Sequence, residues 1–402
     1  MAVLHPFKAW HPDPDNIEEI ACVPYDVVSI PEARELAQNK AHSFLHVVRP
    51  EIDLPENTDQ HDDRVYKKGA ENLNKLLENG TFQQEDETHV YVYQLIRNGR
   101  THTGIFGCVS VEDYDNEVIL KHELTRPVKE DDRTRHILTQ QAHAEPVMMT
   151  YKDDEQTAKL IDETTQQEPL FDFIADDGVT HKIWRAPQTQ ALVDAFSHIS
   201  HLYIADGHHR CKSASRAAEK KRGKNPNHTG DEEYNFFPAV LFPMSDMNIL
   251  SYNRVVHDIP DNFLDNLSTQ FELSPHAQPE PSEKGTISIY INGQWYGMSL
   301  PIADDPNSVQ KLDAHRLQEH LLAPMLDITD PRRDKNISFV GGIRGTQELE
   351  KLVDSGEAEL AISMYATSIE ELVAVSDEGR LMPPKSTWFE PKLASGLLVH
   401  TF

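Results

Sequence analysis

The sequence has few cysteines, no long apolar run and a shortage of positive charge. Its three cysteines, Cys22, Cys108 and Cys211, are too widely spaced for a disulfide framework or a metal-binding knuckle. No apolar stretch approaches the roughly 18 residues that a membrane helix needs. The opening residues, MAVLHPFKAWHPDPDN, lack the apolar core of a secretory signal. We therefore expect a cytoplasmic protein with no membrane partner.

The shortage of positive charge limits the partners of the protein. Lysine and arginine number 38 against 66 aspartates and glutamates, which gives a formal net charge of −28. Nucleic-acid affinity depends on neutralising phosphates, so we expect no nucleic-acid partner. Any phosphate that the protein binds should belong to a small-molecule substrate held in a local pocket. The net charge is compatible with a homo-oligomer.

What the sequence does contain is a succession of strand and helix patterns over 402 residues, long enough for more than one domain. Residues 1–117 combine an amphipathic helix pattern with a hairpin that turns at Asn98-Gly99, which indicates an N-terminal α+β unit. Strands and helices alternate through residues 118–255 and again through 256–402, after a second hairpin at Asn292-Gly293. The predicted fold class is α/β (α+β mixed), in three domains with these boundaries. The helices expected lie near 62–79, 131–143, 155–164, 189–197 and 208–220.

The most specific motif is DGHHR at residues 206–210, which we call the DGHHR turn. It follows the short apolar run LYIA and precedes an alanine-rich helix pattern. A strand that turns into a helix N-terminus directs backbone N–H groups and the positive end of the helix dipole at one point, where anions bind. The residues expected to bind a phosphate are Gly207, His208, His209 and Arg210. The alternative is that Asp206 only caps the helix while the histidines pack against their neighbours.

A second candidate group lies in the segment HELT at residues 122–125. His122, Glu123 and Thr125 precede several basic residues and a helix pattern. Glu123 is either a general base that its basic neighbours keep ionised or an ordinary paired surface charge. The sequence does not separate these two interpretations.

Two further segments are candidates for substrate binding. Tyr252, Asn253 and Arg254 come after an apolar strand, and Arg254 could hold a carboxylate or form a surface ion pair. Lys385, Ser386 and Thr387 follow a rigid diproline. They could close over a ligand, or belong to a tail that docks on a core.

These motifs together carry a resemblance to known families. PYDVVS at residues 24–29, HELT, ADGHHR and the C-terminal PPKSTWFEPKLASGL resemble a widespread family of uncharacterised cytoplasmic proteins. From about residue 118 the chain is also similar to the free serine kinases. Their phosphate motif is DGHHR, their catalytic glutamate lies in an HE pair, and their C-terminus carries PK followed by two threonines.

The resemblance implies a ParB/sulfiredoxin-like nucleotide-binding fold for residues 118–255. It also implies that ATP or ADP binds at the DGHHR turn, with Mg²⁺ near Asp206 and with His209 and Arg210 stabilising the transferred phosphoryl group. Glu123 would deprotonate the acceptor, which the resemblance suggests is free L-serine. Sulfiredoxin activity is not implied, because His208 stands where those enzymes carry their reactive cysteine.

Two rival functions stay open. One is a nucleotide-binding regulator of the ParB-like class that transfers no phosphoryl group, although the acidic charge disfavours DNA as its target. The other is a structural protein whose histidine-rich turn is merely capped. The first 117 residues have no counterpart in the short kinases.

Overall fold

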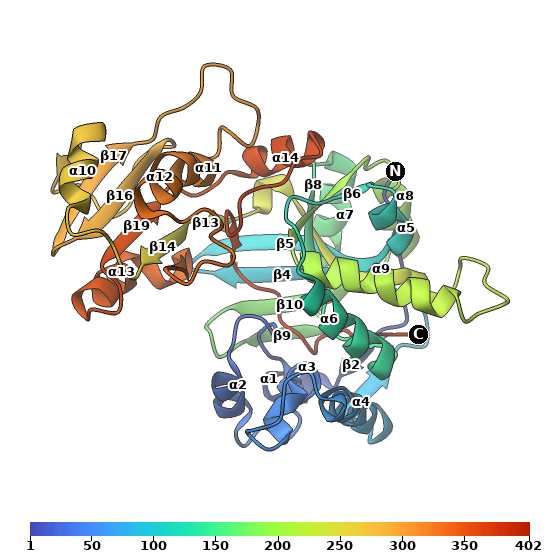
Figure 1. The fold of residues 1–402 in the computed structure, drawn as a ribbon. Coiled ribbons are helices and arrows are strands. Elements are labelled where there is room, and N and C mark those ends of the chain that lie inside the picture. Colours follow the sequence, from blue (N-terminus) through green and yellow to red (C-terminus); the bar gives the residue numbers. More distant parts are fainter. The chain divides into compact units, whose positions relative to one another are not determined.

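The computed structural model describes residues 1–402 and divides the chain into two compact units (Figure 1). Unit 1 comprises Met1–Met247 together with Pro391–Phe402, and unit 2 is the continuous segment Asn248–Glu390. Each unit has its own sheet and its own hydrophobic cores. No helix combines the length and the apolar character needed to cross a membrane.

Unit 1 is built on a mixed nine-stranded sheet with the order β6-β11-β8-β12-β5-β4-β10-β9, to which β1 adds by pairing with β5. Only the pairs β6–β11 and β8–β12 are parallel. This sheet confirms the mixed α/β class. Its strands are β1 (Leu4–His5), β4 (Tyr91–Arg97), β5 (Arg100–Ser110), β6 (Ile119–Leu120), β8 (Val147–Tyr151), β9 (Phe171–Ile174), β10 (Thr180–Arg185), β11 (Leu202–Asp206) and β12 (Phe236–Pro243).

The first hairpin of the sheet forms where the sequence predicts it. Asn98 and Gly99 both have positive φ, 51° and 76°, as a tight two-residue turn requires. The turn pairs Arg97 with Arg100 and sets the register through to Tyr91 and Phe106. Two smaller pairs complete the strands of unit 1: β2 (Trp10–Pro12) with β3 (Phe82–Gln84), and β7 (Ala142–His143) with β21 (His400–Thr401).

Helices pack against this sheet and against one another. The helices of unit 1 are α1 (Ile17–Ile20), α2 (Ile30–Ala37), α3 (Leu45–Val48), α4 (Asp63–Glu78), α5 (Val111–Asp115), α6 (Pro127–Gln140), α7 (Glu155–Thr165), α8 (Thr189–Phe196) and α9 (His208–Arg222). Helices α6 and α9 are in direct contact. Because α9 carries small residues such as Ala214 and Ala218 on its buried side, it packs closely against the core.

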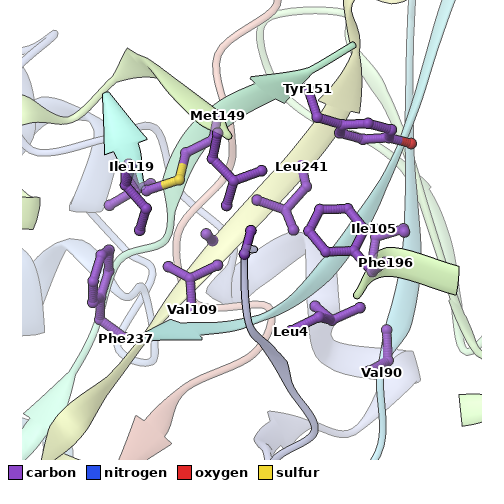
Figure 2. Packing of buried hydrophobic residues seen from close by; sticks show 14 of the residues in the cluster. Leu4, Val90, Ile105, Val109, Ile119, Met149, Tyr151, Phe196, Phe237 and Leu241 are labelled. Atoms are coloured by element: carbon purple, nitrogen blue, oxygen red, sulfur yellow. The ribbon is translucent and has the colours of Figure 1, made fainter. Parts of the chain in front are cut away.

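The main core of unit 1 lies between the sheet and its helices (Figure 2). Leu4, Ile105, Val109, Met149 and Leu241 come from four strands and are buried together. Phe196 at the end of α8 packs its ring edge against Tyr151, with ring centroids 5.2 Å apart. Burial of this apolar area is the main favourable term that holds β11, and hence the DGHHR turn, in place.

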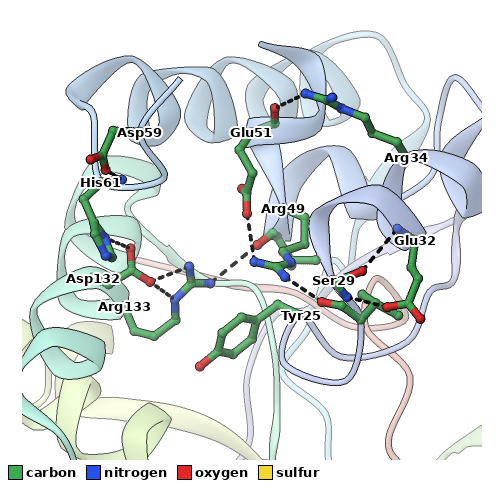
Figure 3. A network of polar contacts seen from close by, with 12 residues as sticks. Tyr25, Ser29, Glu32, Arg34, Arg49, Glu51, Asp59, His61, Asp132 and Arg133 are labelled. Atoms are coloured by element: carbon green, nitrogen blue, oxygen red, sulfur yellow. Dashed lines mark hydrogen bonds and ion pairs between the residues drawn. The ribbon is translucent and has the colours of Figure 1, made fainter. Parts of the chain in front are cut away.

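A polar network joins the N-terminal helices to α6 (Figure 3). Asp132 binds the Arg133 guanidinium at 2.8 Å and accepts the Tyr66 hydroxyl at 3.0 Å. The same guanidinium lies 4.0 Å from the centre of the Tyr25 ring. Ser29 and Glu32 form a capping box at the start of α2. The network therefore ties the segment that contains PYDVVS to the helix that follows HELT.

Unit 2 contains a six-stranded sheet, wholly antiparallel, with the order β15-β17-β16-β19-β14-β18. Its strands are β14 (Tyr252–Val256), β15 (Ser274–Pro275), β16 (Thr286–Ile291), β17 (Gln294–Ser299), β18 (Ile337–Gly341) and β19 (Leu360–Met364), and β13 (Ile249–Leu250) pairs separately with β20 (Trp388–Phe389). Its helices are α10 (Phe263–Gln270), α11 (Asp313–Leu317), α12 (Ala323–Leu326), α13 (Gly345–Asp354) and α14 (Ile369–Asp377). The hairpin predicted at Asn292-Gly293 joins β16 to β17.

The structure groups the chain differently from the three predicted ranges. Strands β4 and β5 lie within residues 1–117, yet they share one sheet with β8, β11 and β12. The last residues return to unit 1, where Val399 bridges to Trp10. Pairing between distant strands decides this grouping, and local sequence patterns carry no record of it.

Candidate functional site

The DGHHR turn has the strand–turn–helix form that the sequence predicts. Strand β11 ends at Asp206, Gly207 has φ 109° and ψ 29°, and α9 begins at His208. A Cβ atom at Gly207 would lie 3.0 Å from Arg210 Nε and 3.2 Å from Val147 Cγ1, so both the backbone angle and the space favour glycine. No side chain caps the N-terminus of α9. The helix therefore presents its first N–H groups without a side-chain acceptor.

Asp206 forms ion pairs instead of capping the helix. Its Oδ2 accepts from Lys392 Nζ at 3.2 Å and lies 3.6 Å from an Arg210 guanidinium nitrogen. Burial alone would raise the pKa of Asp206, but the positive charges of Lys392 and Arg210 hold it below the usual range of a carboxyl group. Asp206 is therefore ionised at neutral pH.

Arg210 points into unit 1. Its side chain is buried and donates a hydrogen bond to the Pro146 carbonyl. Burial would lower the pKa of Arg210, but Asp206, Asp26 and Glu145 raise it, so the guanidinium keeps its charge. Its Nε is buried without a hydrogen-bond partner, on the side of Gly207.

The two histidines of the turn are neutral. Burial and the neighbouring His122 lower the pKa of His208, whose ring meets the His122 ring edge-on with centroids 4.4 Å apart. Burial and Arg126 lower the pKa of His209, whose Nε2 accepts the Arg126 backbone N–H at 3.0 Å. The helix dipole disfavours positive charge at the N-terminus of α9, and the two imidazoles there are neutral.

The HELT segment lies next to the turn. The His122 backbone N–H donates to His208 Nε2 at 3.4 Å, which leaves the proton of neutral His208 on Nδ1. This Nδ1 lies 3.9 Å from Glu123 Oε2, and the Glu123 side chain is 31% exposed. Burial lowers the pKa of His122 to about 3. The structure thus brings Glu123, His122 and the DGHHR turn together. Thr125, further along, donates its hydroxyl to Glu130 at 2.6 Å.

The remaining predicted site residues belong to unit 2. Arg254 is buried on β14, donates to the Tyr252 carbonyl and, at 3.2 Å, to the Lys385 carbonyl, and burial lowers its pKa to about 10. Asn253 accepts the Met364 backbone N–H at 2.9 Å. The surface ion pair considered for Arg254 is therefore not what the structure contains.

The PPKST segment forms part of the same environment in unit 2. The Lys385 ammonium lies 5.2 Å from the centre of the Tyr252 ring. Buried Ser386 donates its hydroxyl to the Pro383 carbonyl at 2.8 Å, and Thr387 is half-buried. These contacts support the interpretation of the segment as ordered chain docked on a core.

The sequence did not point to three residues near the turn: Tyr25, Glu145 and Lys392. Lys392 binds Asp206, although 186 residues separate the two in sequence. Glu145 accepts the Tyr25 backbone N–H at 3.1 Å, and burial raises its pKa. The only sequence signal was that Tyr25 and Lys392 fall inside the segments PYDVVS and PPKSTWFEPKLASGL, and nothing distinguished Glu145.

Comparison with known protein families shows which family the chain belongs to. The model of a family described as "Protein of unknown function (DUF1015)" matches residues 4–315. The chain belongs to this family. No curated protein matches it.

Several solved structures share a distant likeness with this DUF1015 protein. A structure titled "Free serine kinase in complex with AMP" is 11% identical, with 71% of this chain and 86% of that chain covered and a TM-score of 0.36. A free serine kinase mutant in complex with ADP is 10% identical, with 71% and 87% covered and a TM-score of 0.37. SbnI with a C-terminal truncation, from Staphylococcus aureus, is 14% identical, with 72% and 84% covered and a TM-score of 0.38.

The DUF1015 chain offers limited ligands for a metal ion. No group of three or more histidine, cysteine, aspartate or glutamate side chains is arranged to hold one. Mg²⁺, however, is commonly held by one or two carboxylates together with substrate phosphates. Asp206 is an ionised carboxylate two residues before the start of helix α9. This donor fits a magnesium ion that arrives with a nucleotide, and it does not fit a resident metal.

Proposed function

We propose that this protein is a nucleotide-dependent kinase that transfers a phosphoryl group to the hydroxyl of a small molecule, with free L-serine as the acceptor. The observation that carries the proposal is the uncapped, glycine-initiated N-terminus of α9, with ionised Asp206 on one side and Glu123 next to His208 on the other. An anion site and a carboxylate base thus lie in one region of unit 1.

In this proposal the phosphates of ATP or ADP bind at the DGHHR turn. The backbone N–H groups of residues 208–210 face them, and neutral His209 donates from Nδ1 because its Nε2 already accepts from Arg126. A buried N–H without a partner is costly, and the Arg210 Nε beside Gly207 is one. A phosphate oxygen or a bridging water at the turn would satisfy it.

Asp206 would hold the magnesium ion, and Arg210 would fix the position of Asp206. The ion would supply neutralisation of phosphate charge when bound. Lys392 and Arg210 hold the pKa of the Asp206 carboxyl below its usual range, so the carboxylate is ionised at neutral pH. Arg210 therefore supports phosphate binding through Asp206 as well as through its own charge.

Glu123 would act as the general base. The acceptor hydroxyl oxygen forms a bond to the terminal phosphorus, the bond from that phosphorus to the bridging oxygen of the nucleotide breaks, and Glu123 takes the hydroxyl proton. Phosphoryl transfer depends mainly on positioning and on electrostatic stabilisation, so no covalent intermediate is needed. The choice of L-serine and the ParB/sulfiredoxin-like fold rest on the motif resemblance. His122 and Thr125 stay predictions as substrate-binding residues.

A second candidate is a nucleotide-binding regulator that transfers no phosphoryl group. One observation favours it: Asp206 already has two cationic partners, which compete with a magnesium ion for its oxygens. In this alternative the nucleotide would bind the turn directly.

The test is incubation of the full chain with Mg²⁺, ATP or ADP and a panel of hydroxylated small molecules that includes L-serine, followed by ³¹P NMR. The kinase proposal expects a new phosphate-ester signal with one acceptor. Nucleotide binding without product would support the regulator, and the absence of both binding and product would leave a structural protein.

A further inference from the structure

The segment PYDVVS carries two polar groups that the proposed reaction has not used. Tyr25 and Asp26 form a turn in which the Val27 N–H donates to the Pro24 carbonyl at 3.3 Å. Tyr25 is only 3% exposed, whereas Asp26 is exposed. Both residues therefore need an account of what their polar atoms contact.

The ring and the backbone of Tyr25 are fixed by residues close to the DGHHR turn. The Tyr25 N–H donates to Glu145 Oε1 at 3.1 Å, and the Arg133 guanidinium lies 4.0 Å from the centre of the ring. The residue after Glu145 is Pro146, whose carbonyl accepts from Arg210. Two consecutive residues thus hold Tyr25 on one side and the arginine of the DGHHR turn on the other.

The hydroxyl of Tyr25 has no hydrogen-bond partner in the protein. Figure 3 shows it pointing away from Arg49 and Glu51. It does not belong to the unpartnered side-chain atoms that are shut off from solvent, so it faces accessible space. Burial raises the pKa of Tyr25, and the charge of Arg210 is among the smaller effects that lower it. The hydroxyl is therefore protonated at neutral pH, where it can both donate and accept a hydrogen bond.

The carboxylate of Asp26 also has no partner, because it forms neither a hydrogen bond nor an ion pair. Burial and Arg126 lower the pKa of His209, whereas Asp26 raises it. Asp26 therefore acts electrostatically on the DGHHR turn. Arg126 and Lys129 act on the same histidine, but neither forms an ion pair with Asp26.

The charges around these two groups indicate what kind of ligand group fits. The two guanidinium groups that act on the Tyr25 hydroxyl each have a carboxylate partner already. The groups left over are the Asp26 carboxylate and the Tyr25 oxygen, and both accept hydrogen bonds. A protonated primary amine has three N–H donors and a positive charge, so it complements both.

We propose that Tyr25 and Asp26 bind the protonated amine of the acceptor, which for L-serine is its α-ammonium group. The inference rests on the proposed function, in which Glu123 takes the hydroxyl proton of the same molecule. Glu123 lies beside His208 and Asp26 acts on His209, so the two carboxylates serve consecutive residues of the turn. The class of acceptor is then a primary amine with a neighbouring hydroxyl group.

A matched pair of acceptors tests this class. L-serine and D-glycerate share a hydroxyl and a carboxylate, and glycerate carries a second hydroxyl where serine carries the ammonium group. With the full chain, Mg²⁺ and ATP or ADP, ³¹P NMR should show transfer to L-serine. Transfer to D-glycerate should be slower by about tenfold or more, because a hydrogen bond between charged groups is missing.

Two variants test the residues. Asp26→Asn should raise the KM for L-serine by about tenfold or more and leave kcat and the KM for the nucleotide unchanged. Tyr25→Phe removes a hydroxyl that has no partner in the protein and keeps the ring beside Arg133, so the fold should persist while the KM for L-serine rises roughly threefold. Asp15→Asn is the matched control, because Asp15 is an exposed carboxylate in the same N-terminal region.

Equal use of L-serine and D-glycerate, or an unchanged KM for L-serine in Asp26→Asn, would overturn the inference and leave the kinase proposal in place. Absence of transfer to any acceptor would contradict the kinase proposal instead. Ligand-observed NMR titration of L-serine against the full chain with ADP and Mg²⁺ then decides the inference by itself. Binding that Asp26→Asn weakens and Asp15→Asn does not would support the amine site, and absence of binding would overturn it.

Discussion

Asp206 is the residue on which the charges of the candidate site converge. It ends strand β11, binds Lys392 at 3.2 Å and lies 3.6 Å from Arg210. The sequence analysis expected His208, His209 and Arg210 to bind a phosphate here. The structure has two neutral histidines and one arginine turned inward, because burial disfavours protonation of the imidazoles.

The role of Glu123 is tested by Glu123→Gln. A general base typically contributes roughly 10² to 10⁴ in rate, so we expect turnover to fall by that factor while nucleotide affinity in calorimetry stays unchanged. Glu117→Gln is the matched control, because Glu117 is an exposed carboxylate in the preceding segment that pairs with Lys121. Loss of affinity and turnover together, or of neither, would remove Glu123 from the role of base.

Asp132 gives the protein an acid-sensitive element. Burial would raise its pKa, but Arg133 and His136 lower it to about 2. Figure 3 shows the contact of Asp132 with Arg133. Because the pKa of Asp132 is lower in the folded state than in the unfolded state, its ionised form stabilises the fold. This contribution to the free energy of unfolding is complete above about pH 4 and is lost as the pH falls toward 2. Asp132→Asn should therefore reduce the free energy of unfolding by about 2 kcal/mol at pH 7.

The measurement for Asp132 is urea unfolding at several pH values. The difference between wild type and Asp132→Asn should shrink as the pH falls from 4 to 2. Asp131→Asn is the control, since the Asp131 side chain is 62% exposed and its ion pair with Arg216 is on the surface. A constant difference over the whole pH range would contradict the assigned pKa.

At the scale of elements, the junction between β11 and α9 depends on Gly207. Any other residue with this positive φ would be strained by roughly 1–3 kcal/mol. A Cβ atom at this position would also come into close contact with Arg210 and Val147. Gly230 also has a positive φ, 105°, but nothing lies within 4 Å of a Cβ atom there. We expect Gly207→Ala to lower the urea midpoint clearly more than Gly230→Ala, and equal shifts would show that the close contacts do not matter.

The elements that the sequence predicted correctly are those with strong local signals. The helix expected at 62–79 is α4, the one expected at 208–220 is α9, and both Asn-Gly turns join hairpins. The hairpin of β9 and β10 was not predicted, although its turn contains Asp177 and Gly178, because its strands are short and only partly apolar. Helix α6 begins earlier than expected because Pro127 fits the first turn of a helix.

At the scale of the whole molecule, the C-terminal segment completes unit 1 after the chain has formed unit 2. Leu397, Leu398 and Val399 are fully buried in unit 1, and β21 pairs with β7. Truncation after Glu390 should therefore destabilise unit 1 and leave unit 2 intact. Hydrogen exchange should show lost protection in β8, β11 and β12 and unchanged protection in β16 and β19. Equal loss in both units, or in neither, would contradict the division.

This return of the chain also explains which part of the site the sequence could supply. Asp206, Gly207 and Glu123 lie in motifs whose local form indicates a helix N-terminus or a carboxylate among basic residues. Lys392 acts on Asp206 only because tertiary packing brings the C-terminal segment to β11. A contact of this kind leaves no periodicity or spacing in the sequence.

The most direct measurement is the crystal structure of the full chain with ADP and Mg²⁺. Nucleotide phosphates within hydrogen-bond distance of the backbone N–H groups of residues 208–210, with the ion on Asp206, are the expected result. An empty DGHHR turn at saturating nucleotide, or a nucleotide bound elsewhere on the protein, would contradict it.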